Sequence, residues 1–410
     1  MAEAAVPVEE HLARVLGLVD PLPVRLTAID SARGAVLVRN VVASEALPRF
    51  DHAAMDGYAV RAADVGAASV DDPVSLPVVG SVAAGARWPH AHESGTALRI
   101  MTGAPVPAGA DLVVPFEWTD RGDPVLVHRS APVGRHIRRA GEDLAAGAVA
   151  LPAGTVLGPQ HLGLLAAVGT TEVPVRTRPR VAVVVTGDEL LPPGARFGEG
   201  APHSPDSNTT ALAAAASAAG ASVVASGPVP DDRGALLDRL LRATEVADVV
   251  VTTGGISAGD HDVVKAALRD QDGFWFGSVA IKPGRPQGCG VATRPGGRSV
   301  PVVCLPGTPV AAYLSFLLFV RPALDRLTGL PQRPRPRAPL AAPVPRSPDR
   351  TLLLPAAYDD RGRLRQLAGH VGHSQRVLAR ADAVLVVGPG PGAVSAGEEV
   401  ELLPLHRDGS

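Results

Sequence analysis

The chain has 410 residues, a formal net charge of -2 and 46% hydrophobic residues. Because this charge is so small, no overall basic field is present and a nucleic-acid partner is not indicated. No apolar run approaches the roughly 20 residues that a membrane helix needs, so we expect no membrane partner. The length predicts roughly two to four domains.

The N-terminal residues predict a helix and not a signal peptide. Acidic residues stand where a signal peptide needs positive charge, so we expect a cytoplasmic protein. Apolar residues recur at helical spacing at Val8, Leu12, Val15, Leu16 and Val19.

Two residue types are rare enough to be informative. The only cysteines, Cys289 and Cys304, are too few for a disulfide framework and lack metal-ligand spacing, so we expect two buried small hydrophobic residues. Lysine is equally rare, since Lys265 and Lys282 are the only two among 39 basic residues. A lysine that persists among arginines marks a position where a compact ammonium matters, although chance would also account for two cases.

Residues 74–149 are expected to form short valine-rich strands separated by Gly and Pro, which indicates a β-rich module that we place at residues 46–144. Asp56, in a Met-Asp-Gly-Tyr turn, is either the first residue of an ordinary turn or a functional acid. The loop RIMTGAPVP at 99–107 offers hydroxyl and backbone donors to a pocket. The segment 134–143 contains three arginines and two acids, and is either a salt-bridged hairpin or an anion cradle in which Asp143 faces a metal.

An apolar helix is predicted from Gln160 to Val168, between a Gly-Pro pair and Gly169. We expect residues 145–176 to pack on the N-terminal helices. In that case residues 1–45 and 145–176 form one domain, and residues 46–144 are inserted into it.

From residue 177 to 328 strands and helices alternate, which predicts a parallel sheet. Four segments rich in Gly, Pro and charge are expected at the carboxyl ends of strands, where ligands bind in such sheets. They are TGDEL at 186–190, TTGGISAGDHD at 252–262, IKPGR at 281–285 and LPGTP at 305–309. The sequence therefore predicts that these segments converge on one binding site.

The residues after the sheet divide into two parts. A stiff Pro- and Arg-rich linker at 329–337 marks a domain boundary. Residues 338–410 contain short strands and glycine turns. No GxxxxGK[ST] motif occurs, which argues against a phosphate-loop nucleotide hydrolase.

Taken in order, the motifs resemble the molybdopterin molybdenumtransferases, the MoeA and gephyrin E-domain type. The matching runs span residues 55–310 and are MDGYAV, RIMTGAPVP, RRAGED, TGDEL, DSN, PDD, GGISAGDHD, KPGRP and LPGTPV. The resemblance implies an α/β and β multidomain fold. Its parts are a split helical and strand domain at 1–45 and 145–176, a β-rich insertion at 46–144, a MogA-like parallel α/β molybdopterin-binding domain at 177–328, and a C-terminal β-barrel at 338–410.

The resemblance also implies a reaction and its partners. The family inserts molybdate into adenylylated molybdopterin, with release of AMP, in the last step of molybdenum cofactor synthesis. It implies Mg2+ as cofactor, molybdate as substrate, a homodimer, and contact with the molybdopterin adenylyltransferase. Because several acids around a pyrophosphate would repel it, a divalent cation suits the residue types.

The site residues are implied by motif match. The expected catalytic groups are Asp56, Asp143, Glu189, Asp231, Asp262 and Lys282, of which Glu189, Asp231 and Asp262 would hold the metal. The expected substrate-binding residues are Thr102, Thr186, Gly187, Asp206, Ser207, Asn208, Gly254, Gly255, Ser257, Gly259, Asp260, Pro283, Gly284, Arg285, Pro306, Gly307 and Pro309.

Three positions depart from the family pattern, and they bear on how the anion is contacted. A family lysine four residues before Lys282 is Ser278 here, and the second basic residue of KPGK is Arg285. The asparagine between the two family prolines is Thr308.

Two alternatives remain open at this point. One is a paralogue that handles tungstate, an oxyanion of the same shape. The other is a non-catalytic molybdopterin-binding or scaffold protein, against which the intact set of acids argues.

Overall fold

The computed structural model describes residues 4–85, 87, 91–196, 203–257, 262–293, 299–332, 334–368 and 373–405. The chain divides into two compact units. The first contains residues 1–25, 34–38 and 175–410, and the second contains residues 26–33 and 39–174. Among the helices of the described ranges, none combines the length and the apolar character needed to cross a bilayer.

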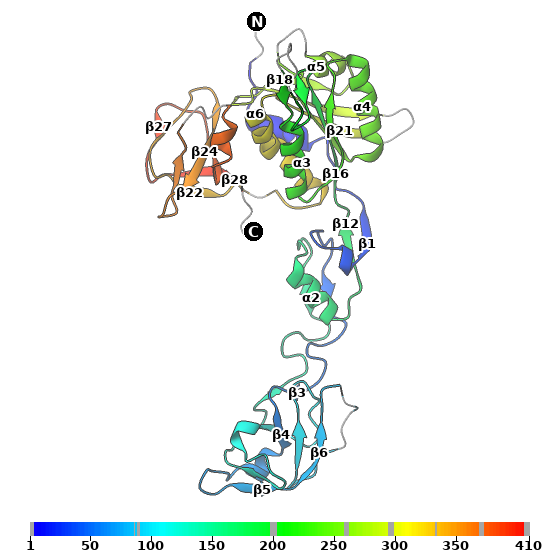
Figure 1. The fold of residues 1–410 in the computed structure, drawn as a ribbon, viewed down its shortest axis with the longest axis vertical. Coiled ribbons are helices and arrows are strands. Elements are labelled where there is room, and N and C mark those ends of the chain that lie inside the picture. The colour runs from blue at the N-terminus through cyan, green and yellow to red at the C-terminus, as the bar shows by residue number, and fades with distance from the viewer. Residues whose placement is uncertain are drawn as a thin grey trace. The chain divides into compact units, whose positions relative to one another are not determined.

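A six-stranded sheet forms the centre of the first unit, in the order β16-β13-β17-β21-β20-β18 (Figure 1). The first four strands are parallel and the last two are antiparallel additions. Their bounds are β13 (Arg180–Thr186), β16 (Ser222–Val229), β17 (Val249–Thr253), β18 (Trp275–Ser278), β20 (Pro286–Thr293) and β21 (Ser299–Leu305). The valine runs of β13, β17 and β21 are almost wholly buried, as expected for parallel strands covered on both faces.

Successive residues of β13 belong to two different cores, one on each face of the sheet. Val181 and Val183 pack with α1, α3, α6 and α7, whereas Ala182 and Val184 pack with α4 and α5. The bounds are α1 (Val8–Leu16), α3 (Asn208–Ala218), α4 (Arg233–Val246), α5 (Val263–Leu268), α6 (Pro309–Ser315) and α7 (Arg321–Leu327). A π-helical segment, η4 (Phe316–Val320), joins α6 to α7, so residues 309–327 form three consecutive helical segments.

The position of the N-terminal segment differs from the expectation. Residues 1–45 were expected to share a domain with residues 145–176, but α1 packs in the core of the first unit through Val8 and Val15. The apolar stripe of α1 therefore covers the α/β sheet. The four-domain division stays a prediction, since the described chain separates into two units.

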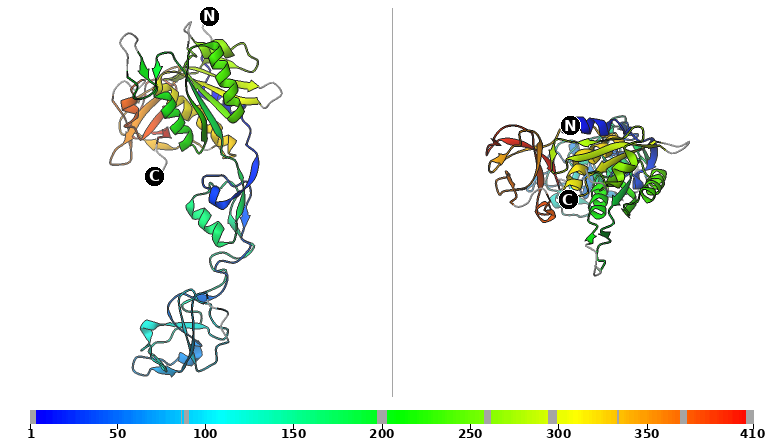
Figure 2. Two further views of the ribbon diagram at one scale, coloured as in Figure 1. Left: turned by 45° about the vertical axis from the view of Figure 1, so that its right-hand side comes forward. Right: turned by 90° about the horizontal axis from the view of Figure 1, so that it is seen from above.

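The C-terminal strands form a second sheet within the first unit, in the order β19-β24-β26-β28-β22, with β25 pairing β24. They lie beside the central sheet in both Figure 1 and Figure 2 and share its core through Leu353, Val384 and Val386. The bounds are β19 (Ile281–Lys282), β22 (Arg337–Pro339), β23 (Val344–Pro345), β24 (Thr351–Tyr358), β25 (Leu364–Gln366), α8 (Gln375–Leu378), β26 (Ala383–Val387), β27 (Ala393–Val394) and β28 (Glu399–Pro404). The strand pairings of the described residues do not close this sheet on itself, so the barrel stays a prediction.

The second unit is rich in short strands, as the sequence predicts. Its main sheet has the order β6-β7-β4-β8 and buries Tyr58, Val60 and Val114. The bounds are β2 (Val41–Val42), β3 (His52–Ala53), β4 (Gly57–Val60), β5 (Val74–Leu76), β6 (Val78–Val82), β7 (Ala97–Ile100), β8 (Leu112–Pro115), β9 (Val125–Val127), β10 (Ile137–Arg138), β11 (Val149–Leu151) and α2 (Pro159–Ala167). Two of the four unit boundaries fall inside β1 (Val24–Ala28) and its partner β12 (Glu172–Arg176), and the other two enclose residues 34–38.

The turn after β17 brings three backbone segments into contact. Gly254 and Gly255 have φ of +94° and +63°, in the left-handed region that side chains rarely adopt. A Cβ atom on Gly254 would lie 2.7 Å from both the carbonyl oxygen and the Oγ1 of Thr186. A Cβ on Gly307 would lie 3.2 Å from the Cα of Gly254. The ends of β13, β17 and β21 therefore approach more closely than side chains would allow.

Gly254→Ala should destabilise the protein more than Gly273→Ala. Both glycines have positive φ, but a Cβ on Gly273 meets no heavy atom within 4 Å. In each variant the left-handed conformation should lower the free energy of unfolding by about 1–2 kcal/mol. At Gly254 the clash with Thr186 should lower it by roughly 1–3 kcal/mol more. Urea denaturation of both variants measures the difference. Equal losses would contradict the close approach of these loops.

Candidate functional site

A cavity of about 860 Å³ lies at the carboxyl ends of β13, β16, β17 and β21. This is the edge of a parallel sheet at which ligands bind. The segments TGDEL, GGIS and LPGTP, all predicted to converge, contribute to its wall. Predicted site residues that line it are Thr186, Gly187, Glu189, Asp206, Ser207, Asn208, Asp231, Gly254, Gly255, Ser257, Asp262, Gly284, Pro306, Gly307 and Pro309. Their roles stay predictions, and Gly259 and Asp260 lie outside the described residues.

The segment IKPGR is not placed as expected. We expected it at the carboxyl end of a strand of the central sheet, but β19 pairs in parallel with β24 of the C-terminal sheet. Ile281 is buried in the core that both sheets share, and its backbone pairs with Thr351 of β24. Gly284 lines the cavity, whereas Lys282, Pro283 and Arg285 are not among its described lining residues.

The described lining of the cavity is acidic. It contains the carboxylates of Glu189, Asp206, Asp231 and Asp262, and it contains no Lys, Arg or His. The loops bearing Asp188 and Asp231 are joined, because the Asp231 N–H donates to Asp188 Oδ1 at 2.9 Å. An anionic ligand in this cavity would therefore meet like charges unless a cation accompanies it.

Asp206 has a structural role that the sequence did not reveal. Its carboxylate accepts a hydrogen bond from the N–H of Thr209 at 2.9 Å and another from the Thr209 hydroxyl. The side chain is almost completely buried. The first of these bonds satisfies one backbone donor in the first turn of α3, where free N–H groups would otherwise remain.

The carboxylate chemistry of the cavity suits Mg2+, which prefers oxygen ligands. Across the described ranges, no group of three or more His, Cys, Asp or Glu side chains is arranged to hold a metal ion. Mg2+ is commonly held by one or two carboxylates together with substrate phosphates and waters, so a preformed cage of three acids is not required. The assignment of Glu189, Asp231 and Asp262 as metal ligands stays a prediction.

A buried hydrogen-bond network fixes the loops around the cavity. Asn208 Nδ2 donates to the Gly307 carbonyl at 2.7 Å and to Thr253 Oγ1 at 3.2 Å. Thr253 Oγ1 in turn donates to the Pro306 carbonyl at 2.7 Å. Asn208 thus ties the start of α3 to the ends of β17 and β21.

Thr186 offers a hydroxyl to the cavity. Its Oγ1 atom is buried and has no hydrogen-bond partner within the described structure. Burying a hydroxyl without a partner is costly, so such a group commonly serves a ligand or an ordered water. The hydroxyl lies against Gly254, and its contact with a ligand stays a prediction.

Several lining residues were not predicted from the sequence. Thr308 lies within the LPGTP motif, where it was noted only as a departure from the family pattern, and Ser204 lies two residues before the DSN motif. Gln375 comes from α8 in the C-terminal sheet region, and no local signal places it in the cavity. The unpredicted lining residues are Val185, Leu190, Ser204, Pro205, Ile256, Pro286, Thr308 and Gln375.

In the second unit, Asp56 and Thr102 are in contact, which the sequence analysis did not predict. Asp56 Oδ1 accepts hydrogen bonds from the Thr102 N–H and from Thr102 Oγ1, both at 2.7 Å. These two bonds, the backbone one first, hold the pKa of Asp56 below its ordinary value. Asp56 is therefore kept as a carboxylate. Its other oxygen, Oδ2, accepts neither of these two hydrogen bonds.

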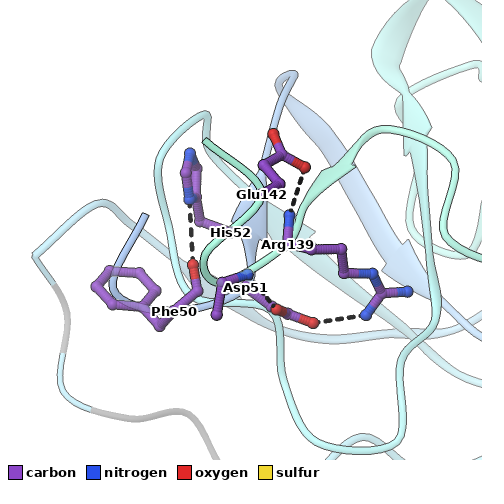
Figure 3. Close-up of polar contacts among 6 residues, drawn as sticks. Phe50, Asp51, His52, Arg139 and Glu142 are labelled. Carbon is purple, nitrogen blue, oxygen red and sulfur yellow. Dashed lines mark hydrogen bonds and ion pairs between the residues drawn. The ribbon is translucent and has the colours of Figure 1, made fainter. Parts of the chain in front are cut away.

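The segment 134–143 resembles a salt-bridged hairpin more than an anion cradle. Arg139 Nη1 lies 2.5 Å from Asp51 Oδ2, and Arg138 Nη1 lies 3.3 Å from Glu142 Oε1. Figure 3 shows Arg139 directed at Asp51 while its backbone N–H faces Glu142. Two of the three arginines are thus paired with carboxylates. The N–H of Asp143 donates to the Leu47 carbonyl at 3.1 Å, which fixes the backbone at that acid.

Comparison with known protein families covers most of the chain. Residues 6–169 match the MoeA N-terminal region (domain I and II), residues 182–326 match a probable molybdopterin binding domain, and residues 337–405 match the MoeA C-terminal region (domain IV). The three matches follow one another in the order that the motifs predict.

Individual relatives give the same result. The chain is 42% identical to molybdopterin molybdenumtransferase 2 of Mycobacterium tuberculosis, over 97% of this chain and 99% of the relative. It is 36% identical to molybdopterin molybdenumtransferase 1 of that organism, over 98% of this chain and 99% of the relative. A solved structure of the molybdopterin biosynthesis moeA protein from Pyrococcus horikoshii OT3 is 29% identical, covers 97% of this chain and 99% of its own, and has a TM-score of 0.78. The chain therefore belongs to the molybdopterin molybdenumtransferase family.

Proposed function

We propose that this chain inserts molybdate into adenylylated molybdopterin and releases AMP, which completes molybdenum cofactor synthesis. The observation that carries this proposal is the acid-lined cavity at the carboxyl edge of the sheet, built from TGDEL, GGIS and LPGTP. The full-length relatives are named molybdopterin molybdenumtransferases, which supports the same reaction. They favour neither the tungstate paralogue nor the scaffold protein.

The residues of the cavity suggest how substrate would be held. The hydroxyls of Thr186 and Ser207 would donate to phosphate or molybdate oxygens, since no basic side chain is among the described lining residues. The glycine turns expose backbone close to the ligand. Glu189, Asp231 and Asp262 would hold Mg2+, which when bound neutralises phosphate oxygens and polarises the bond to the leaving AMP.

A direct assay with and without metal tests this function. Purified protein given adenylylated molybdopterin, molybdate and Mg2+ should release AMP and form cofactor, and excess chelator should stop both. Asp231→Asn should slow AMP release by about tenfold or more, because a neutral amide holds the cation poorly.

The matched control is Asp238→Asn, an exposed acid on α4 that does not line the cavity. Its rate should equal that of wild type. Undiminished AMP release in excess chelator would show that the carboxylates do not act through a divalent cation.

Lys282 is proposed to neutralise phosphate or molybdate as a compact charge. It is exposed at the end of β19, so its removal should leave the fold stable. Lys282→Ala should reduce the rate about ten- to a hundredfold through loss of a charge-assisted contact. Lys282→Arg keeps the charge on a larger planar group and should be intermediate. The control is Arg365→Ala, an exposed cation on β25. Wild-type turnover of Lys282→Ala at saturating molybdate would refute this role.

We also propose the homodimer that the resemblance implies, with Asp56 and Asp143 of one subunit serving the α/β domain of the other. Asp56→Asn and Asp262→Asn should each be inactive alone. Mixing them should restore about a quarter of the wild-type rate, because half of randomly mixed dimers are mixed and each has one intact site. Absence of any recovery in verified mixed dimers would contradict sites shared between subunits.

A cytoplasmic location remains an expectation from the N-terminal residues, and contact with the adenylyltransferase remains an expectation from the resemblance.

A further inference from the structure

One wall of the cavity is provided by the C-terminal part of the chain. Gln375, the first residue of α8, is the one described lining residue that comes from beyond residue 309. Its Nε2 atom donates to Ser207 Oγ at 3.2 Å. Ser207 belongs to the DSN motif and lines the same cavity. A side chain of the C-terminal module is thus hydrogen-bonded to the substrate loop of the α/β sheet.

The position of Gln375 is fixed by its surroundings. The side chain of Ser374 accepts a hydrogen bond from the Val377 N–H at 3.2 Å, which caps the short helix. Leu378 packs against the core that contains Val310 and Leu314 of α6. The first residue of α6, Pro309, itself lines the cavity. Packing against α6 therefore holds α8 at the cavity wall.

The direction of the hydrogen bond determines what Ser207 can do. Because Ser207 Oγ accepts from Gln375, its own hydrogen remains free to be donated elsewhere. The described lining contains four carboxylates and no Lys, Arg or His, so an anionic ligand must take its hydrogen bonds from hydroxyls, amides and backbone N–H groups. A hydroxyl oriented to donate is valuable there for a ligand that carries anionic oxygens.

We propose that Gln375 is a positioning residue that orients the Ser207 hydroxyl toward anionic oxygens of the bound pterin substrate. Through this contact the C-terminal module contributes to substrate affinity. The proposal rests on the proposed function for the identity of the substrate. Its own basis is the contact between Gln375 and Ser207.

Three variants separate this role from a general packing role. Gln375→Ala removes the donor and should raise KM for adenylylated molybdopterin about three- to tenfold, while kcat stays within about twofold. Gln375→Glu should raise KM further, by about tenfold or more, because a carboxylate only accepts and would take the Ser207 hydrogen. Gln366→Ala, on β25 of the same module and outside the cavity lining, should behave as wild type.

A double-mutant cycle tests whether Gln375 acts through Ser207. In the Ser207→Ala background, Gln375→Ala should change KM by less than about twofold. Gln375→Met, which fills similar space without a donor, should match Gln375→Ala and so excludes an effect of lost packing. Full additivity of the two alanine changes, a wild-type KM in Gln375→Ala, or a loss confined to kcat would each overturn the proposal.

Calorimetric titration gives the dissociation constant for molybdopterin independently of turnover. This measurement distinguishes a failure of the proposed function from a failure of the proposed role of Gln375. If wild type binds molybdopterin but releases no AMP, the proposed function fails while the contact is still tested by the weaker binding expected of Gln375→Ala. If wild type releases AMP and Gln375→Ala binds and turns over normally, the inference fails and the function stands. Thermal melting of each variant verifies that it is folded.

Discussion

The close approach of backbone at Gly254 is the constraint on which the rest of the site depends. There the turn after β17 touches Thr186 at the end of β13 and Gly307 after β21, at distances that leave no room for a Cβ. Since parallel strands end at one edge, three loops must share that narrow space. Asn208 then joins two of these loops by hydrogen bonds from the start of α3. A cavity with a defined wall results, and Thr186 keeps a buried hydroxyl beside it.

The parts of the fold governed by short-range pattern were predictable from the sequence. Valine runs predict β13 and β17 as buried parallel strands, and the segments that follow such strands must meet at one edge. The family resemblance, carried by nine ordered motifs, is confirmed by the full-length relatives. The same reasoning could not separate a ligand from a helix cap, since Asp206 precedes a helix in either role and only the structure shows its bonds to Thr209.

The features that sequence reasoning missed all depend on contacts between distant segments. Nothing near Gln375 predicts a place in the cavity, because that place follows from the packing of α8 against α6. Likewise β19 joins β24, so the segment with Lys282 belongs to a different sheet from the one expected. The apolar stripe of α1 predicts a buried face but not the partner that buries it, which is the core of the α/β sheet. A local pattern specifies that a surface is buried, while the packing of the whole chain determines against what.

The N-terminal segment and the C-terminal sheet both hydrogen-bond to the segment that precedes Gly284. The Val6 N–H donates to the Ser278 carbonyl and the Ala280 N–H donates to the Val6 carbonyl, each at 2.8 Å. On the other side the Thr351 N–H donates to the Ala280 carbonyl at 2.8 Å. Residues 278–282 are therefore held between the N-terminal segment and the first long strand of the C-terminal sheet. Because Gly284 follows two residues after Lys282 and lines the cavity, the geometry of this wall depends on segments that contribute no lining residue of their own. Together with the contact of Gln375 to Ser207, this arrangement makes the C-terminal sheet part of the machinery that shapes the site.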